Sequence, residues 1–122
     1  MEIKKIRDGS KLTVEIVGRL DAVSAMDLDK NLSKNELSEV TELTIDMTKL
    51  DYIASAGLRI LLKLHKFMSS KGKMIIKNPQ KEVSDVIEMS GFSRILTVEG
   101  ERKQSFEFSI AGDNNDSQIF KL

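Results

Sequence analysis

Hydrophobic and polar residues alternate near the start of the chain, which is the period of a strand with one buried face. The pattern covers residues 11–17, with its apolar positions at Leu12, Val14 and Ile16. Ile3 and Ile6 mark a weaker strand before it, and Asp8–Gly9 between the two is a common hairpin turn. We therefore expect an antiparallel hairpin, after which Gly18–Asp21 leads the chain out of the sheet.

Two segments further along carry the helical period of about 3.6 residues. A mostly polar helix is predicted from Asp21, its expected N-cap, to about Leu37. Its thin apolar stripe consists of Ala25, Leu28 and Leu32. A strongly amphipathic helix is predicted to begin at the small-residue turn 54–57 and to end before Gly72. Its core-facing arc consists of Ile60, Leu61, Leu64, Phe67 and Met68, and its edge near the turn of Leu58, Leu62 and His65.

Short apolar segments separated by helical ones complete the pattern. We predict strands at 43–47, 73–77 and 95–98, and a short helix over 81–90 that Gly91 ends. Such alternation implies parallel strands joined by right-handed crossovers. The predicted fold class is α/β: a single mixed β-sheet with helices packed against it, in which N-terminal antiparallel strands precede a βαβαβ unit.

The last part of the chain gives a weaker signal. Residues 105–110 alternate like a strand, although one turn of helix is compatible with the same residues. Residues 111–122 form a polar tail, which we expect to be mobile. The chain has no internal repeat and no long linker, so residues 1–110 are expected to form one domain.

Composition narrows the functional classes. The 122 residues include 19 basic and 19 acidic side chains, a balance that argues against direct nucleic-acid binding. One histidine and no cysteine leave only carboxylates for a metal, and their spacing matches no calcium loop. We expect no metal and no cofactor, since no phosphate-binding glycine loop occurs either. With no apolar run of roughly 20 residues and no signal sequence, a cytoplasmic protein without membrane contact is expected.

Ser55 is the reactive side chain of the small-residue turn. Two compatible roles are open to it, the N-cap of the following helix and a phosphorylation site. A phosphate there would meet free N–H groups and the positive helix end, so it would disturb a docked partner rather than the fold. The candidate contact residues for that partner are the small Ala54, Ala56 and Gly57 and the apolar Leu58 and Leu62.

Serine hydrolysis is a weak alternative for Ser55. The nucleophile elbow requires glycine two residues before and after the serine, and here Ile53 precedes while Gly57 follows. His65 lies ten residues further along the same predicted helix, about 15 Å along its axis, too far to act as a base. We therefore expect that the protein is not an enzyme.

Three segments resemble the motifs of the STAS domain family, specifically of bacterial anti-sigma factor antagonists. Residues 46–62 resemble the signature segment, with the sequence DMTKLDYIASAGLRILL. Gly18–Asp21 resembles a second motif, and Met89–Leu96 a third. The three occur in the family's order and spacing, and the likeness covers roughly residues 2–100.

The resemblance implies a partner-switching regulator. Such an antagonist binds an anti-sigma factor that is also a serine kinase, and thereby frees a sigma factor. The kinase phosphorylates the antagonist, the complex dissociates, and a serine phosphatase resets the switch. By motif position the phosphorylated residue is Ser55, with Asp21 and Asp46 as family carboxylates near it. Each carboxylate also has a structural interpretation, Asp21 as an N-cap and Asp46 as a strand-end acceptor of loop N–H groups.

Two departures from the family pattern keep a second hypothesis open. The best-known members carry Asp directly before the phosphorylated serine, where this chain has Ala54. The family usually ends with a helix, which residues 105–110 do not clearly predict. The alternative is a STAS module that acts as a scaffold or sensor in another signalling assembly without phosphorylation.

Overall fold

The computed structural model describes residues 1–100, and the alternation at the start of the chain forms the predicted hairpin. Strand β1 (Glu2–Asp8) pairs antiparallel with β2 (Lys11–Leu20). The prediction that β2 ends at residue 17 was wrong, because Gly18–Leu20 stays in the sheet and pairs with a further strand. The register shifts after Gly18, whose φ of 104° lies in the left-handed region that favours glycine. This irregularity bends β2 toward its second partner.

The parallel part of the sheet contains the three predicted strands, but the last one, predicted at 95–98, begins two residues later because Ile95 still belongs to the end of a short helical turn. Strands β3 (Glu42–Asp46), β5 (Lys73–Lys77) and β6 (Thr97–Glu99) continue the sheet in the order β1-β2-β3-β5-β6, and every pair after the hairpin is parallel. Strand β4 (Leu50–Ile53) was not predicted, and it pairs with the end of β2. Only the first and last of its four residues are buried. In the sequence, so short a pattern cannot be distinguished from a turn.

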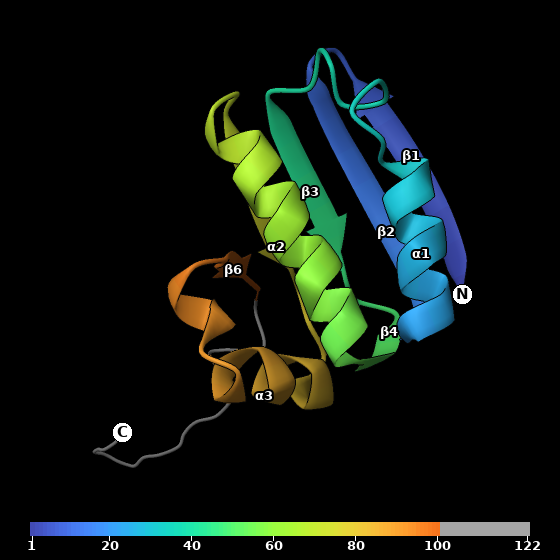
Figure 1. The fold of residues 1–122 in the computed structure, drawn as a ribbon, viewed down its shortest axis with the longest axis vertical. Coiled ribbons are helices and arrows are strands. Elements are labelled where there is room, and N and C mark those ends of the chain that lie inside the picture. Colours follow the sequence, from blue (N-terminus) through green and yellow to red (C-terminus); the bar gives the residue numbers. More distant parts are fainter. Residues whose placement is uncertain (101–122) are drawn as a thin grey trace.

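The helices lie mainly on one face of the sheet (Figure 1). Helix α1 (Ala22–Asn31) and helix α2 (Ser55–Ser69) lie side by side over the strands, while α3 (Lys81–Met89) lies at one end of the sheet. Gly91, with φ of 83°, follows α3 as predicted and leads into the short helix η1 (Phe92–Arg94). The mixed α/β sheet expected from the sequence is confirmed.

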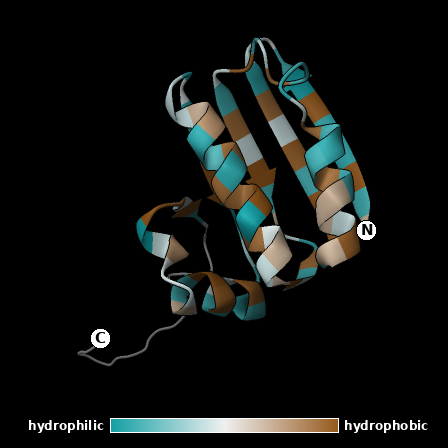
Figure 2. Cartoon of the chain, in the orientation of Figure 1, coloured by the Kyte–Doolittle hydropathy of each residue, from teal (hydrophilic) through white to brown (hydrophobic). Residues whose placement is uncertain are grey.

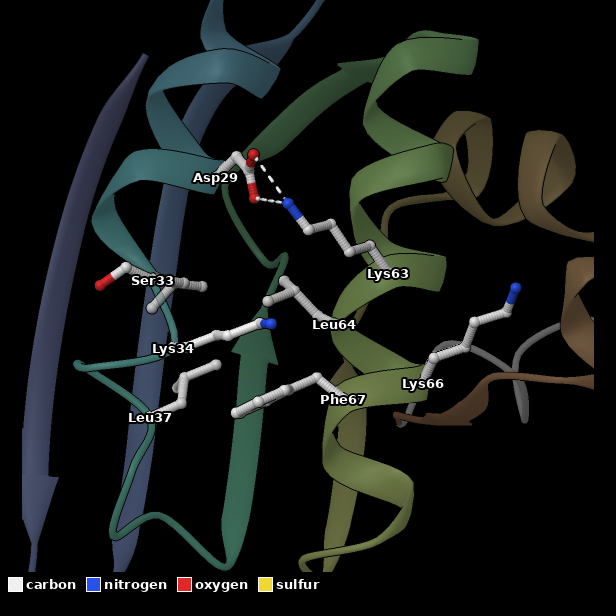
Figure 3. Close-up of a pocket in the computed structure, with 9 residues that line it drawn as sticks. Asp29, Ser33, Lys34, Leu37, Lys63, Leu64, Lys66 and Phe67 are labelled. Carbon is white, nitrogen blue, oxygen red and sulfur yellow. Dashed lines mark hydrogen bonds and ion pairs between the residues drawn. The ribbon is translucent and has the colours of Figure 1, made fainter.

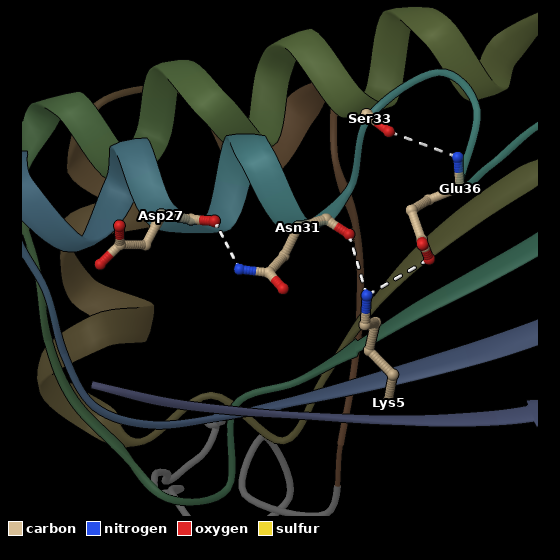
Figure 4. A network of polar contacts seen from close by, with 5 residues as sticks. All are labelled: Lys5, Asp27, Asn31, Ser33 and Glu36. Carbon is tan, nitrogen blue, oxygen red and sulfur yellow. Dashed lines mark hydrogen bonds and ion pairs between the residues drawn. The ribbon is translucent and has the colours of Figure 1, made fainter.

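Helix α1 ends at Asn31, earlier than the predicted Leu37, and polar contacts hold the turn that follows it (Figure 4). The Lys5 ammonium donates to the Asn31 carbonyl at 3.2 Å and to Glu36 Oε1 at 3.2 Å. The chain then turns, and Ser33 Oγ accepts the Glu36 N–H at 3.4 Å. Residues 32–40 therefore form a loop that still buries Leu37, which the helical pattern had placed on α1.

The core fills the space between the sheet and the two covering helices. Along β2 and β3 nearly every second residue is buried in the core, and this alternation appears as brown bands between paler or teal ones in Figure 2. The fully buried large side chains include Ile16, Leu20, Leu28, Leu43, Ile45, Leu61, Met68 and Ile76. The predicted core arc of α2 is confirmed at its centre, since Leu61, Leu64 and Met68 are buried and Ile60 and Phe67 pack against the core. The expectations for residues 105–110 and 111–122, and the domain end at 110, lie outside the described residues.

Candidate functional site

The site is built where two paired strands each lead into a helix. Parallel strands β2 and β4 end together, with Leu20 opposite Ile53, and the Leu20 carbonyl accepts the Ala54 N–H at 2.9 Å. One residue later each chain segment enters its helix, α1 after Asp21 and α2 after Ala54. The starts of α1 and α2 therefore emerge side by side at one edge of the sheet. We call this pair of segments the helix starts.

Ser55 is exposed as the first residue of α2. The interpretation of Ser55 as an N-cap is wrong, because the N-cap is Ala54 and no side chain caps this helix. Helix α2 thus begins one residue earlier than a capping serine would require. Free N–H groups of the first turn are left for solvent or for an anion. Within residues 1–100 the Ser55 hydroxyl has no hydrogen-bond partner.

Asp21 caps α1, which confirms its structural interpretation. Its carboxylate Oδ1 accepts the Ser24 N–H at 3.0 Å and the Ser24 hydroxyl at 2.9 Å, while its own N–H donates to Ser24 Oγ at 2.8 Å. This is a reciprocal capping box. The Ser24 N–H, and after it the Ser24 hydroxyl, hold the pKa of the Asp21 carboxyl below its ordinary value of 3.8. Asp21 is therefore a fixed negative charge at the helix starts.

Asp46 has the loop-binding role that its position at a strand end predicted. Its Oδ1 accepts the Thr48 N–H at 3.0 Å and the Thr48 hydroxyl at 2.6 Å. These bonds turn the chain from β3 toward β4. The half-buried Asp46 is thus used in shaping the loop before the site.

The predicted partner-contact residues divide into two groups. Ala54, Ala56 and Leu62 are partly exposed and remain available for contact. Gly57 and Leu58 are buried, so expecting them at the surface was wrong. A Cβ on Gly57 would lie 2.8 Å from Leu20 Cγ, which shows that the glycine lets α2 approach β2 closely. The sequence pattern placed Leu58 at the edge of the helix, whereas its side chain is only 6% exposed.

Apolar and cationic residues beside the helix starts were not predicted from the sequence. Val23 and Met26 on α1 are 72% and 61% exposed. Met26 lines a groove of about 380 Å³ between α1 and α2, together with Ala56 and Arg59 of the first turns of α2. Val23 and Met26 lie off the Ala25–Leu28 stripe, so the helical pattern alone would have placed these two apolar residues on the outer face of α1. They give the helix starts an apolar surface that suits a protein partner.

A second missed feature is the pairing of Arg19 with Tyr52. The guanidinium carbon of Arg19 lies 4.2 Å from the centre of the Tyr52 ring, a cation–π contact between neighbouring strands β2 and β4. Tyr52 remains 40% exposed. This pair adds an aromatic side chain to the same edge of the sheet, and it depends on a strand pairing that the sequence did not reveal.

Neither a histidine base beside Ser55 nor a metal-binding cluster is found within residues 1–100. Ser55 and His65 both lie on α2, about 15 Å apart along its axis, so this histidine does not activate the serine. Within residues 1–100 no group of three or more histidine, cysteine, aspartate or glutamate side chains is placed to hold a metal ion. The helices of that part of the chain are too short or too polar to cross a membrane.

Comparison with named proteins gives consistent matches. The STAS domain family model matches residues 2–105. A protein named "Putative anti-sigma factor antagonist BtrV", from Bordetella bronchiseptica, is 30% identical over 87 residues, or 70% of this chain and 75% of the relative. The anti-sigma-B factor antagonist of Listeria monocytogenes is 27% identical over 105 residues, or 83% of this chain and 91% of that protein.

Solved structures share the fold. The anti-sigma factor antagonist SpoIIAA in its unphosphorylated form has a TM-score of 0.71 and 18% sequence identity, covering 84% of this chain and 91% of that chain. The phosphorylated form of the Bacillus cell fate determinant SpoIIAA has a TM-score of 0.64 and 17% identity, covering 84% and 95%. Taken with the match over residues 2–105, the mixed sheet and its helices lead to one conclusion: this chain belongs to the STAS domain family.

Proposed function

We propose that the protein is an anti-sigma factor antagonist: it binds an anti-sigma factor with serine kinase activity, releases a sigma factor, and is switched off by phosphorylation of Ser55. A serine phosphatase would restore the active form. The family membership and the names of the relatives support the antagonist role. The observation that carries the switch is the exposed Ser55 hydroxyl at the uncapped start of α2.

A charge added at Ser55 would act on a docked partner more than on the fold. Phosphorylation adds nearly two negative charges, and the start of a helix stabilises an anion through its free N–H groups and dipole. The fold should therefore tolerate the phosphate. A partner docked over the helix starts would instead meet a new, strongly hydrated anion beside Asp21, which is already charged. Burial of both charges is unfavourable, so the partner dissociates.

The partner surface is the exposed part of the helix starts. Val23 and Met26 provide apolar contact area on α1, and the partly exposed Ala54 and Ala56 allow a partner's backbone to approach closely. Leu62 extends this surface along α2 as a partly exposed apolar residue. The combination of an apolar centre and a charged rim is typical of protein interfaces. None of these contacts requires chemistry by the chain itself, in keeping with a regulator that is not an enzyme.

Substitution of Ser55 tests the proposal. Ser55→Asp should abolish binding to an anti-sigma factor kinase that co-purifies with the protein, while unfolding free energy changes by less than about 0.5 kcal/mol. Ser33→Asp is the matched control, because Ser33 is also exposed but lies in the loop after α1. Mass spectrometry after incubation with ATP and that kinase should place one phosphate on Ser55. Phosphorylation elsewhere, or none, would contradict the switch.

A scaffold or sensor role is the second candidate, and Ala54 favours it. Ala54 provides no carboxylate directly before Ser55, and its N–H is already bonded to the Leu20 carbonyl. A STAS scaffold would bind its partner equally well with serine or aspartate at position 55. The same Ser55→Asp binding measurement therefore separates the two functions.

A further inference from the structure

A second groove between α1 and α2 lies away from the helix starts, where the loop of residues 32–40 covers the seam (Figure 3). We call it the loop groove. It has a volume of about 540 Å³, within the range of small-molecule sites. Its floor consists of Leu32, Leu37 and Leu64, each at most 3% exposed, and its partly exposed apolar side chain is Phe67. Phe67 lies about 18 Å along α2 from Ser55, so this groove is separate from the proposed phosphorylation site.

The charged groups that line the loop groove are one carboxylate, that of Asp29, and three ammonium groups, those of Lys34, Lys63 and Lys66. Lys63 is paired with Asp29, with its ammonium 3.0 and 3.1 Å from the two carboxylate oxygens. Lys34 has no hydrogen bond or ion pair through its ammonium within residues 1–100. Figure 3 shows the Lys34 side chain extending across the opening toward Leu64, while Lys66 points away. An apolar groove with one unpaired ammonium over it favours a monoanion with an apolar body.

The ends of the groove favour a small molecule over a docked helix. The Asp29–Lys63 ion pair joins α1 to α2 across the seam, and both residues also line the groove beside the helix starts. The pair therefore separates the two grooves. A partner helix lying along the whole seam would have to break it, whereas a ligand confined to the loop groove would leave it intact.

The groove is held open by contacts on both sides. The Lys71 ammonium donates to the Ser38 carbonyl at 2.7 Å and lies 5.6 Å from the centre of the Phe67 ring. On the other side, Lys5 binds Glu36 at 3.2 Å. The loop and the Phe67 ring are thus fixed before any ligand arrives, which reduces the ordering cost of binding.

We propose that the loop groove binds an aliphatic carboxylate, with its chain against the partly exposed Phe67 ring and the aliphatic stems of the lining lysines, and its carboxylate at the Lys34 ammonium. The proposal is independent of phosphorylation at Ser55. A neutral chain of equal length would keep the apolar contacts and lose the charge-assisted hydrogen bond, so it should bind about tenfold more weakly.

The test uses decanoate below its micelle concentration, added to the full-length protein and followed by amide chemical shifts. We expect saturable changes confined to residues 32–37 and 63–67, and about tenfold weaker binding of decanol. Lys34→Glu should weaken decanoate binding by tenfold or more. Lys30→Glu is the matched control, an exposed lysine at the end of α1 that does not line the groove, and it should change affinity less than about twofold.

Several outcomes would overturn the proposal. One is the absence of saturation at about 1 mM decanoate, the weak limit of a specific small-ligand site. Another is equal weakening by both lysine substitutions, which would show attraction to general positive charge. Shifts centred on residues 54–57 would place the ligand at the helix starts instead. Because both substituted lysines are exposed, a melting curve of each variant suffices to confirm that it folds.

Discussion

Gly57 offers the sharpest test of how α2 is held at the site. A Cβ at this position would lie 2.8 Å from Leu20 Cγ and 3.0 Å from Ile53 Cγ1. Leu20 is fully buried, so it has little room to move aside. Overpacking of a core costs about 1–3 kcal/mol, while replacing glycine by alanine inside a helix gains up to about 1 kcal/mol. We expect Gly57→Ala to lower the free energy of unfolding by about 1 kcal/mol.

A double-mutant cycle separates the two contributions. In a Leu20→Ala background the two closest atoms are absent and only the Ile53 Cγ1 contact at 3.0 Å remains, so Gly57→Ala should cost less stability there than in the wild type. Leu20→Ala alone should cost about 2–5 kcal/mol as a core truncation. The coupling between the two positions should be about 1–3 kcal/mol. Urea unfolding followed by circular dichroism measures all four proteins.

The control for this cycle is Ser55→Ala. The Ser55 side chain is exposed whereas Leu20 is fully buried, so substitution of Ser55 should have the same small effect in both backgrounds. If Gly57→Ala changes stability equally with and without the Leu20 side chain, close packing is not the reason for glycine at this position. A role for Gly57 in partner contact would then have to be reconsidered.

Four further predictions concern the helices around the site. Leu61→Ala should cost about 2–5 kcal/mol because Leu61 is fully buried. Leu62→Ala should weaken partner binding more than folding, and equal losses in melting temperature would refute the assignment of helix faces. Asp21→Asn tests pH dependence: a lowered folded pKa contributes stability that is present above the unfolded value of 3.8 and lost as pH falls through the folded pKa. The advantage of wild type over Asp21→Asn, measured by urea unfolding, should therefore stay nearly constant from pH 6 down to about pH 4 and shrink as the pH falls below 3.8. Arg59→Gln should reduce the thermal stability of phosphorylated protein more than that of unphosphorylated protein, because Arg59 lies four residues after Ser55 on α2.

Local patterns predicted those parts of the fold whose residues interact with near neighbours in sequence. The strand at residues 73–77 was predicted with the bounds that the structure gives β5, and the buried centre of α2 followed from its helical period. The end of α1 could not be predicted in this way. Leu32 leaves the helical conformation, and Lys5, on a strand far away in sequence, donates to the carbonyl of Asn31, the last residue of the helix. Patterns within one segment carry no information on such a contact.

The site was predicted only in part for the same reason. Ser55 was placed at the start of a helix from the residues around it, and Asp21 was placed as a cap from its own position. That the two lie at one edge of the sheet depends on the pairing of β2 with β4, which joins residues about thirty positions apart and which the short β4 did not signal. The same pairing buries Gly57 and so removed it from the predicted partner surface.

The close packing at Gly57 also bears on how a phosphate at Ser55 would act. Two residues after Ser55, α2 is held against Leu20 and Ile53 with no space for a single extra carbon atom. The start of the helix has no freedom to shift inward, and the Ser55 side chain already faces solvent. A phosphate added there must therefore project outward into whatever covers the helix starts. A switch of this kind needs no change in the fold, because the rigid attachment of α2 directs the whole effect of the added charge to the partner.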